Sequence, residues 1–293
     1  MKTRTAAPWV ALLPMAVVVL VVYAGGFLWT TRVSLSSSAS LPVADFVGFA
    51  QYARLFTTER WLASLRHGAQ FTLLFVVLGM LIGVLLAIAM DRLLRGEVLL
   101  RAVFVYPYAL SFVAAGLIWQ WMFNPTLGLQ AAIRALGFAD FRLDWIVDPH
   151  RALYTILIAT LWQSAGIVMA IVLSGLRSID PTVWHAARVD GIPTWRVYLQ
   201  VVFPMLAGTF STAGILLLTI AIKLFDPVVA MTQGGPGLAT EVPTKFIMEH
   251  LFVRANVGLA SAAAVSLTVL AVAVLWPLVW IRRRAVRAGE GAA

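Results

Sequence analysis

The chain has 293 residues, of which 61% are hydrophobic and 12% charged, and its formal net charge is +9. This apolar fraction is too large for one soluble core of ordinary size to bury, so the composition predicts a membrane protein. The basic residues are scattered between apolar segments rather than gathered on one polar domain, which argues against a nucleic-acid-binding protein. The absence of cysteine excludes a disulfide framework, and the four widely separated histidines show no metal-ligand spacing.

Six apolar runs follow one another along the chain. A helix needs about 20 apolar residues to cross the hydrocarbon, and each run has roughly that length. None of the runs shows the period-2 alternation of a barrel strand. We therefore predict an all-α, polytopic membrane protein with six transmembrane helices, between a short N-terminal segment, 1–8, and a tail, 282–293. The predicted spans, which make up a domain at 9–281, are 9–31, 68–90, 102–123, 153–176, 205–229 and 257–281.

The positions of Lys and Arg predict how these helices are oriented. With the N-terminus inside, the inner side holds twelve Lys and Arg residues and the outer side nine. The inner loops are the shorter ones, and an arginine cluster at 282–287 follows the last span, so both termini are predicted to be cytoplasmic. The first span is predicted to be a retained anchor, because its uncharged run, 5–31, is longer than a secretory signal core. The Ser- and Ala-rich stretch 34–44 leaves cleavage open as an alternative.

The inner stretch 177–204 has the pattern of a short polar helix-turn-helix between two apolar spans. Asp180 and Pro181 are a typical helix start, with Asp as the cap and Pro in the first turn. Gly191 is predicted to end this helix, and Pro193 to begin a second one. The first helix offers a small-residue face for a soluble partner, made by Val183, Ala186, Ala187 and Val189. An amphipathic interfacial connector without a partner is the alternative.

Four segments resemble a known family of permeases. The positions His185, Ala186, Ala187, Gly191, Val201, Phe203 and Pro204 are similar, in register, to the cytoplasmic coupling motif of binding-protein-dependent ABC importer permeases. The segments L-S-G-L-R-S-I-D-P at 173–181, W-Q-W-M-F-N-P-T-L-G at 119–128 and F-D-P-V-V-A-M-T-Q-G-G-P-G at 225–237 resemble the sugar-importing, maltose-type branch of that family. The resemblance covers the chain from the first span to the last.

This resemblance implies the type I ABC importer permease fold and a coupling loop at 177–204. The ATPase-coupling residues that it implies are His185, Ala186, Ala187, Asp190, Gly191 and Pro204. The family usually carries Glu where this chain has His185, and His offers at most a hydrogen bond or a partial positive charge. No G-x-x-x-x-G-K-[ST] phosphate loop occurs in the sequence. ATP and Mg are therefore expected on partner subunits, with no cofactor, catalytic residue or metal site in this chain.

The partners implied by the resemblance are a second homologous permease subunit, two ATP-binding subunits and a periplasmic or extracellular solute-binding protein. The expected location is the bacterial cytoplasmic (inner) membrane, with the spans in the lipid bilayer and substrate moved by alternating access. An ion-coupled secondary carrier is the alternative. Asp226 is the one carboxylate well within a predicted span, whereas such carriers usually need more intramembrane acids and internal repeats.

By the same resemblance, the sugar-contacting positions fall in the fourth and fifth spans, where costly polar residues indicate a cavity. The substrate-pathway candidates are Trp162, Gln163, Ser164, Gly166, Lys223 and Asp226. Lys223 and Asp226 are three apart on one predicted helix, and an internal ion pair or a subunit interface is the alternative role for them. Trp119, Gln120 and Trp121 are predicted to form an interfacial belt rather than to stack on sugar.

The substrate is expected to be a carbohydrate. The segment 223–243 most resembles permeases for glucose or mannose and related small sugars. A disaccharide and glycerol-phosphate are the alternatives, because those systems share much of the pattern. Selectivity in the family rests largely on the external binding protein, so the sequence does not single out one sugar.

Overall fold

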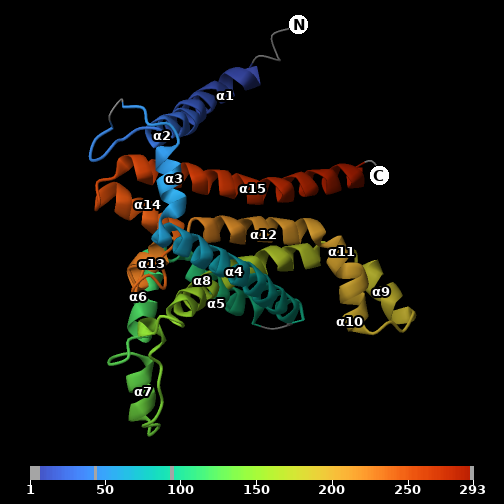
Figure 1. Ribbon diagram of the computed structural model, residues 1–293. Coiled ribbons are helices and arrows are strands. Elements are labelled where there is room, and N and C mark those ends of the chain that lie inside the picture. Colours follow the sequence, from blue (N-terminus) through green and yellow to red (C-terminus); the bar gives the residue numbers. More distant parts are fainter. Residues whose placement is uncertain (1–6, 43–44, 93–95, 291–293) are drawn as a thin grey trace. The chain divides into compact units, whose positions relative to one another are not determined.

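The computed structural model describes residues 7–42, 45–92 and 96–290, and these residues are almost entirely helical (Figure 1). Their one pairing of extended backbone is an isolated bridge between Ser36 and Phe46. The predicted all-α fold is thus confirmed for this part of the chain. Of the two predicted terminal segments, residues 1–6 and 291–293 lie outside the described residues.

Helical segments of very different lengths follow one another along the described chain. They are α1 (Ala7–Val18), η1 (Val19–Gly25), α2 (Gly26–Ser34), α3 (Ala50–Thr57), α4 (Glu59–Asp91), α5 (Glu97–Ala109), α6 (Phe112–Met122), α7 (Leu129–Ala135), η2 (Trp145–Val147), α8 (Ala152–Arg177), α9 (Pro181–Val189), α10 (Thr194–Val197), η3 (Tyr198–Val202), α11 (Phe203–Met205), α12 (Ala207–Ile222), α13 (Asp226–Met231), α14 (Pro243–Phe252) and α15 (Val257–Glu290). The segments η1 and η3 are π-helical, and η2 is a 3₁₀ turn.

Within the described residues, four helical stretches are long and apolar enough to cross a membrane. They are Ala11–Ser34, Glu59–Asp91, Ala152–Arg177 and Val257–Pro277, and they coincide in position with the predicted first, second, fourth and sixth spans. Two bent helix pairs pass the same test together, so up to six spans are possible. The predictions of continuous helices at 102–123 and 205–229 are wrong, because both segments are broken.

The first break separates α5 from α6 at Leu110 and Ser111. Pro107, in the last turn of α5, has no N–H with which to continue the helical hydrogen bonds, and Leu110 is extended. Ser111 then caps α6, because its Oγ accepts a hydrogen bond of 3.1 Å from the Ala114 N–H. The two helices meet at an angle of 100°.

The second broken segment bends by 73° at Leu206, between α11 and α12. A further break follows, because α12 ends at its C-terminal cap, Lys223, and α13 begins at Asp226. Pro227 lies in the first turn of α13 and has no N–H to donate to the Lys223 carbonyl. One regular helix therefore cannot run through this part of 205–229.

The described chain divides into two compact units. The first runs up to Leu62 and includes Phe246–Leu270, and the second comprises Ala63–Lys245 with the described residues from Ala271 onward. The core of the second unit is built around α8, most of whose residues are buried. The helices α5, α6, α12 and α13 all pack against α8.

Two glycines allow neighbouring helices to lie unusually close to the α8 backbone. A Cβ atom on Gly166 of α8 would lie 1.8 Å from the carbonyl oxygen of Phe104 in α5. A Cβ atom on Gly83 of α4 would lie 2.3 Å from Cγ1 of Val168 in α8. Small residues at helix crossings are the usual means of close packing in membranes. The positions of α4 and α5 against α8 therefore depend on these glycines.

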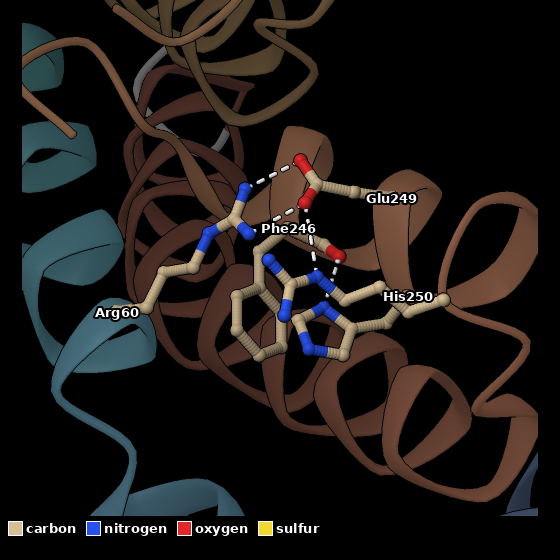
Figure 2. Close-up of polar contacts among 5 residues, drawn as sticks. Arg60, Phe246, Glu249 and His250 are labelled. Carbon is tan, nitrogen blue, oxygen red and sulfur yellow. Dashed lines mark hydrogen bonds and ion pairs between the residues drawn. The ribbon is translucent and has the colours of Figure 1, made fainter. Parts of the chain in front are cut away.

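In the first unit, an ion pair and an aromatic contact connect the start of α4 to α14, and Figure 2 shows the ion pair between Arg60 and Glu249. Arg60 donates to both carboxylate oxygens of Glu249, each at 2.5 Å. The fully buried ring of Trp61 packs against Phe246, with ring centroids 5.2 Å apart, and Phe246 stacks on His250 at 4.0 Å. A bidentate Arg–carboxylate pair is both strong and directional, so it fixes how these two helices meet.

We expect Gly166→Ala to destabilise the protein by about 3 kcal/mol or more, because the added methyl group would force α5 away from α8. The matched control is Gly208→Ala on α12, where a Cβ atom meets nothing within 4 Å and a change within about 0.5 kcal/mol is expected. The free energy of unfolding in detergent measures both effects. Equal stabilities of the two variants would contradict the close crossing of α5 and α8.

His250 makes the first unit sensitive to acid. Burial lowers the pKa of His250 below 6.5; a hydrogen bond to the Phe246 carbonyl opposes this shift, and the charges of Arg254 and Arg60 add to it. Because the unfolded chain takes up a proton at His250 near its ordinary pKa and the folded chain does so only at lower pH, stability is lost as pH falls below 6.5. Relative to His250→Gln, the wild-type melting temperature should fall between about pH 7.5 and about pH 5. Parallel pH profiles of the two proteins would exclude this role.

Candidate functional site

The start of α9 is fixed by the two residues that the sequence singled out. Asp180 Oδ1 accepts a hydrogen bond of 2.8 Å from the Thr182 N–H, and Pro181 occupies the first turn. Because this hydrogen bond stabilises the carboxylate, the pKa of Asp180 is lowered. The predicted helix start is confirmed, and the helix ends at Val189.

Gly191 ends α9 as predicted, and its backbone conformation explains why glycine stands there. Its φ is +66°, in the left-handed region that a side chain disfavours. The Gly191 N–H donates to the Arg188 carbonyl at 3.2 Å, and the Ile192 N–H donates to the Ala187 carbonyl at 3.0 Å. These paired hydrogen bonds are typical of a glycine helix end. The chain then restarts at α10 after Pro193, also as predicted.

We predicted that four small residues of α9 form one face for a partner, and this prediction is wrong because the four residues differ in burial. Val183 and Ala187, four residues apart, are half-buried against the core of the second unit. Ala186 and Val189, three residues apart, are exposed, and Val189 is 86% exposed. The difference in burial, rather than the spacing, thus divides the four positions into a half-buried pair and an exposed pair. The exposed pair, Ala186 and Val189, is the more accessible to another protein.

A cavity of about 610 Å³ lies beside α9 and α10, at the ends of α4 and α8. Its ionisable lining residues are Asp91, Arg92, Arg177, His185 and Arg188. Aromatic and apolar side chains, including Trp184, Val197 and Tyr198, line the rest. The cavity therefore combines an apolar wall with a predominance of positive charge.

The predicted coupling residues are only partly brought together. His185 and Ala187 line the cavity, whereas Ala186, Asp190 and Gly191 are exposed outside it. Pro204 lies further along, in α11 after the π-helical turn η3. Sequence reasoning missed Arg92 and Arg188 as members of this site. The signals were the position of Arg92 directly after the second span and the three-residue spacing of Arg188 from His185 on one helix.

A chain of aromatic rings links α9 to α12. Trp184 meets Tyr198 edge-on with ring centroids 5.3 Å apart, and Tyr198 packs against Phe203 at 6.0 Å. Phe203 in turn meets Phe210 of α12 edge-on at 5.5 Å. Close-packed rings transmit a displacement because they leave little free volume. The helix α9 is thus connected to α12 by a continuous series of ring contacts.

Two of the predicted substrate residues have structural partners inside the bundle. The Gln163 Nε2 donates a hydrogen bond of 2.7 Å to the Leu110 carbonyl, which lies at the break between α5 and α6. Gln163 is only 1% exposed. Gly166, one turn further along α8, lies against the backbone of Phe104. These two residues hold the broken α5–α6 pair against α8.

Ser164 and Trp119 each have a buried polar atom without a hydrogen-bond partner among the described residues, Oγ and Nε1 respectively. An unsatisfied buried polar group costs about 1–3 kcal/mol, so each atom marks a place for water or a polar ligand. Trp119 meets the ring of Trp162 edge-on at 5.8 Å, and Trp162 is 39% exposed. Aromatic rings and unpaired polar groups therefore gather where α6 meets α8.

Lys223 and Asp226 do not lie on one helix, and the prediction that they do is wrong because of the break before Pro227. Both residues are exposed, and the described residues form no ion pair between them. Charges within an apolar stretch need water or another protein for solvation. Their exposure on the isolated chain fits either a water-filled pathway or an interface.

A second cleft, of about 470 Å³, lies between the end of α6 and the loop after α13. Its lining includes Gln120, Trp121, Asn124 and Thr232, and the Trp121 ring is 72% exposed. No group of three or more His, Asp or Glu side chains that could hold a metal ion occurs within the described ranges. These two clefts differ in chemistry: the one beside α9 is basic, and the one near α6 carries amide and aromatic groups.

A bundle with several apolar helices, polar breaks and an exposed helix-turn-helix defines a multi-pass membrane protein. The family model "Binding-protein-dependent transport system inner membrane component" matches residues 79–287. A probable ABC transporter permease protein of Pyrococcus horikoshii is 34% identical over 92% of this chain and 93% of its own length. The xylose/arabinose import permease protein of Haloferax volcanii is 28% identical over 92% of this chain and 85% of its own.

A solved structure matches as well. It is a bacterial alginate ABC transporter in complex with an alginate pentasaccharide-bound periplasmic protein, with a TM-score of 0.82, 18% identity and coverage of 96% of both chains. The chain belongs to the family of binding-protein-dependent transport system inner membrane components, and it has the type I ABC importer permease fold.

Gln163 and Ser164 should respond differently to loss of their polar groups. Gln163→Leu leaves the buried Leu110 carbonyl without a partner, so we expect a loss of about 2 kcal/mol in the free energy of unfolding. Ser164→Ala removes a buried hydroxyl that has no partner within the described chain, so the free energy of unfolding should be equal to that of wild type or higher. Chemical unfolding in detergent compares the two variants. A larger loss for Ser164→Ala would contradict these assignments.

Proposed function

We propose that this chain is the permease subunit of an ATP-driven, binding-protein-dependent sugar importer of the bacterial cytoplasmic membrane. The observation that carries the proposal is the family match over residues 79–287, a region that contains the exposed α9–turn–α10 segment. The names of two compared proteins include a carbohydrate. One is the xylose/arabinose import permease of Haloferax volcanii, and the other is the bacterial alginate transporter. These names support a carbohydrate substrate for this chain.

In the proposed arrangement both termini and the segment 177–204 face the cytoplasm. The distribution of Lys and Arg supports this orientation, because basic residues favour the inner side. The stretches 124–151 and 230–256 then face outward, toward the solute-binding protein. The cleft at Trp121 and Asn124 opens on the same outer side.

The proposed complex also contains a second homologous permease subunit and two ATP-binding subunits, which hold ATP and Mg. This chain contributes transport rather than catalysis, as its relatives are named permeases. Closure of the ATP-binding subunits displaces α9, and the rings from Trp184 to Phe210 pass the displacement to α12. The bundle thereby moves between inward- and outward-facing states as packed bodies.

The proposed substrate pathway follows α8 and the α12–α13 break. Trp162 offers an exposed aromatic face, Ser164 a hydroxyl without an internal partner, and Lys223 and Asp226 exposed charges. Aromatic faces with a few polar groups suit a sugar. Glucose, mannose or a related small sugar is the favoured substrate, from the resemblance of 223–243. The exposed Lys223 ammonium favours glycerol-phosphate as the second candidate, because it can pair with a phosphate.

The test is uptake into proteoliposomes that contain both permeases and the ATP-binding subunits, with labelled glucose delivered by the binding protein. Uptake should require ATP and the binding protein, and it should stop with an ATP-binding subunit that cannot hydrolyse ATP. The lone permease should hydrolyse no ATP. Labelled xylose, maltose and glycerol-phosphate in parallel vesicles compare the substrate classes.

Uptake driven by a sodium or proton gradient without ATP would contradict the proposal and favour the secondary-carrier alternative. Robust ATP hydrolysis by the lone chain would contradict the assignment of the ATPase to partner subunits. If glycerol-phosphate were the one compound taken up with ATP, the proposal of an ATP-driven importer would stand, and the proposal of a sugar substrate would be contradicted.

A further inference from the structure

The carboxylates in and next to the cavity beside α9 are paired with one arginine. Arg177 lies 2.8 Å from Glu97 and 3.7 Å from Asp91. Asp91 is the one carboxylate that lines the cavity. These three residues form a local group in which both acids are paired with Arg177, so neither acid is paired with the other arginines of the cavity.

Two further arginines of the cavity have no acidic partner among the described residues. The Arg92 guanidinium lies over the ring of Tyr198, 5.8 Å from its centroid. The Arg188 Nε donates a hydrogen bond of 3.3 Å to the Trp184 carbonyl. Neither residue takes part in an ion pair within the described ranges. Each guanidinium thus keeps donors that a carboxylate would satisfy.

The same wall carries His185, which is exposed and lies three residues before Arg188 on α9. Residues three apart share a face of a helix, so His185 and Arg188 project from the same side. An imidazole offers a hydrogen-bond donor or a positive charge, and neither repels an anion. All three side chains of the wall therefore favour a negatively charged occupant.

We propose that a carboxylate side chain of the ATP-binding subunit enters this cavity and is held by Arg92 and Arg188. The inference rests on the proposed function for the identity of the partner, and it adds the charge that the partner must present. Guanidinium groups bind carboxylates through paired N–H donors, and the apolar wall at Trp184 and Tyr198 keeps water from one side of the contact.

The surroundings of the cavity favour a protein rather than a lipid as the source of the anion. Ala186 and Val189 are exposed on the outward face of α9, next to His185 and Arg188. Small exposed side chains let another backbone approach closely, whereas a lipid headgroup needs only charge. A cavity with basic donors beside such a face is complementary in charge to an acidic protein surface and leaves room for its backbone.

The experiment measures how tightly the ATP-binding subunits bind the permease pair in nanodiscs, one set made of neutral phosphatidylcholine and the other containing phosphatidylglycerol. The variants are Arg188→Glu, Arg92→Glu and the conservative Arg188→Lys. The matched control is Arg196→Glu on α10, whose guanidinium lies over Trp195 and does not line the cavity. Thermal unfolding of each variant checks that the fold is kept.

We expect each Glu variant at Arg188 or Arg92 to weaken binding about thirtyfold in both lipids. Arg188→Lys should stay within about fivefold of wild type, and the control within about threefold. An Asp→Arg or Glu→Arg substitution in the ATP-binding subunit should restore binding to Arg188→Glu, and it would identify the partner carboxylate.

Wild-type affinity of the two Glu variants would overturn the inference and leave the proposed function intact. A loss of binding confined to nanodiscs with phosphatidylglycerol would also overturn it, because the occupant would then be a lipid phosphate. Failure of the wild-type permease to bind any ATP-binding subunit would instead overturn the proposed function itself.

Discussion

A backbone group that faces the lipid has no water to bond to, so a break in a membrane helix needs a protein partner or a water-filled cavity. The carbonyl of Leu110, between α5 and α6, accepts a hydrogen bond from the Gln163 side chain. The carbonyl of Leu224, between α12 and α13, accepts one from Thr244 Oγ1. The second unit can therefore contain sharp bends because particular side chains satisfy the carbonyl groups that the bends expose.

The same constraint divides the polar residues of the bundle into two groups. Gln163 is buried with its partner and stabilises a bend. Ser164 and Trp119 have buried polar atoms that no described residue satisfies, and Lys223 is exposed. Groups of the second kind cost stability unless water or a ligand meets them, and such a cost is expected where a membrane protein handles polar cargo. Gln163 is therefore assigned to stabilising the fold, whereas Ser164, Trp119 and Lys223 are candidates for contact with the transported substrate.

Much of the fold follows from the sequence, because long apolar runs and helix caps are local signals. Long apolar helices at four of the six predicted positions, the start of α9 at Asp180 and its end at Gly191 agree with what residue type and spacing predicted. The two broken spans were not, although Pro107 and Pro227 are visible, because hydropathy alone does not tell a kinked helix from a broken one. The sequence offered a local signal for Arg92 and for Arg188 separately, but their position in one cavity depends on how helices far apart in sequence pack.

In the proposed complex, the exposed face of α9 couples this permease to its ATPase. The chain contains no cysteine, so a single one can be introduced at Ala186, which is exposed. The most direct measurement is cross-linking in intact membranes from Ala186→Cys, with Ala135→Cys on α7 as the control at another exposed helix. The account predicts that Cys at position 186 captures the ATP-binding subunit and that Cys at position 135 does not. Normal substrate uptake without any such capture from position 186 would contradict it.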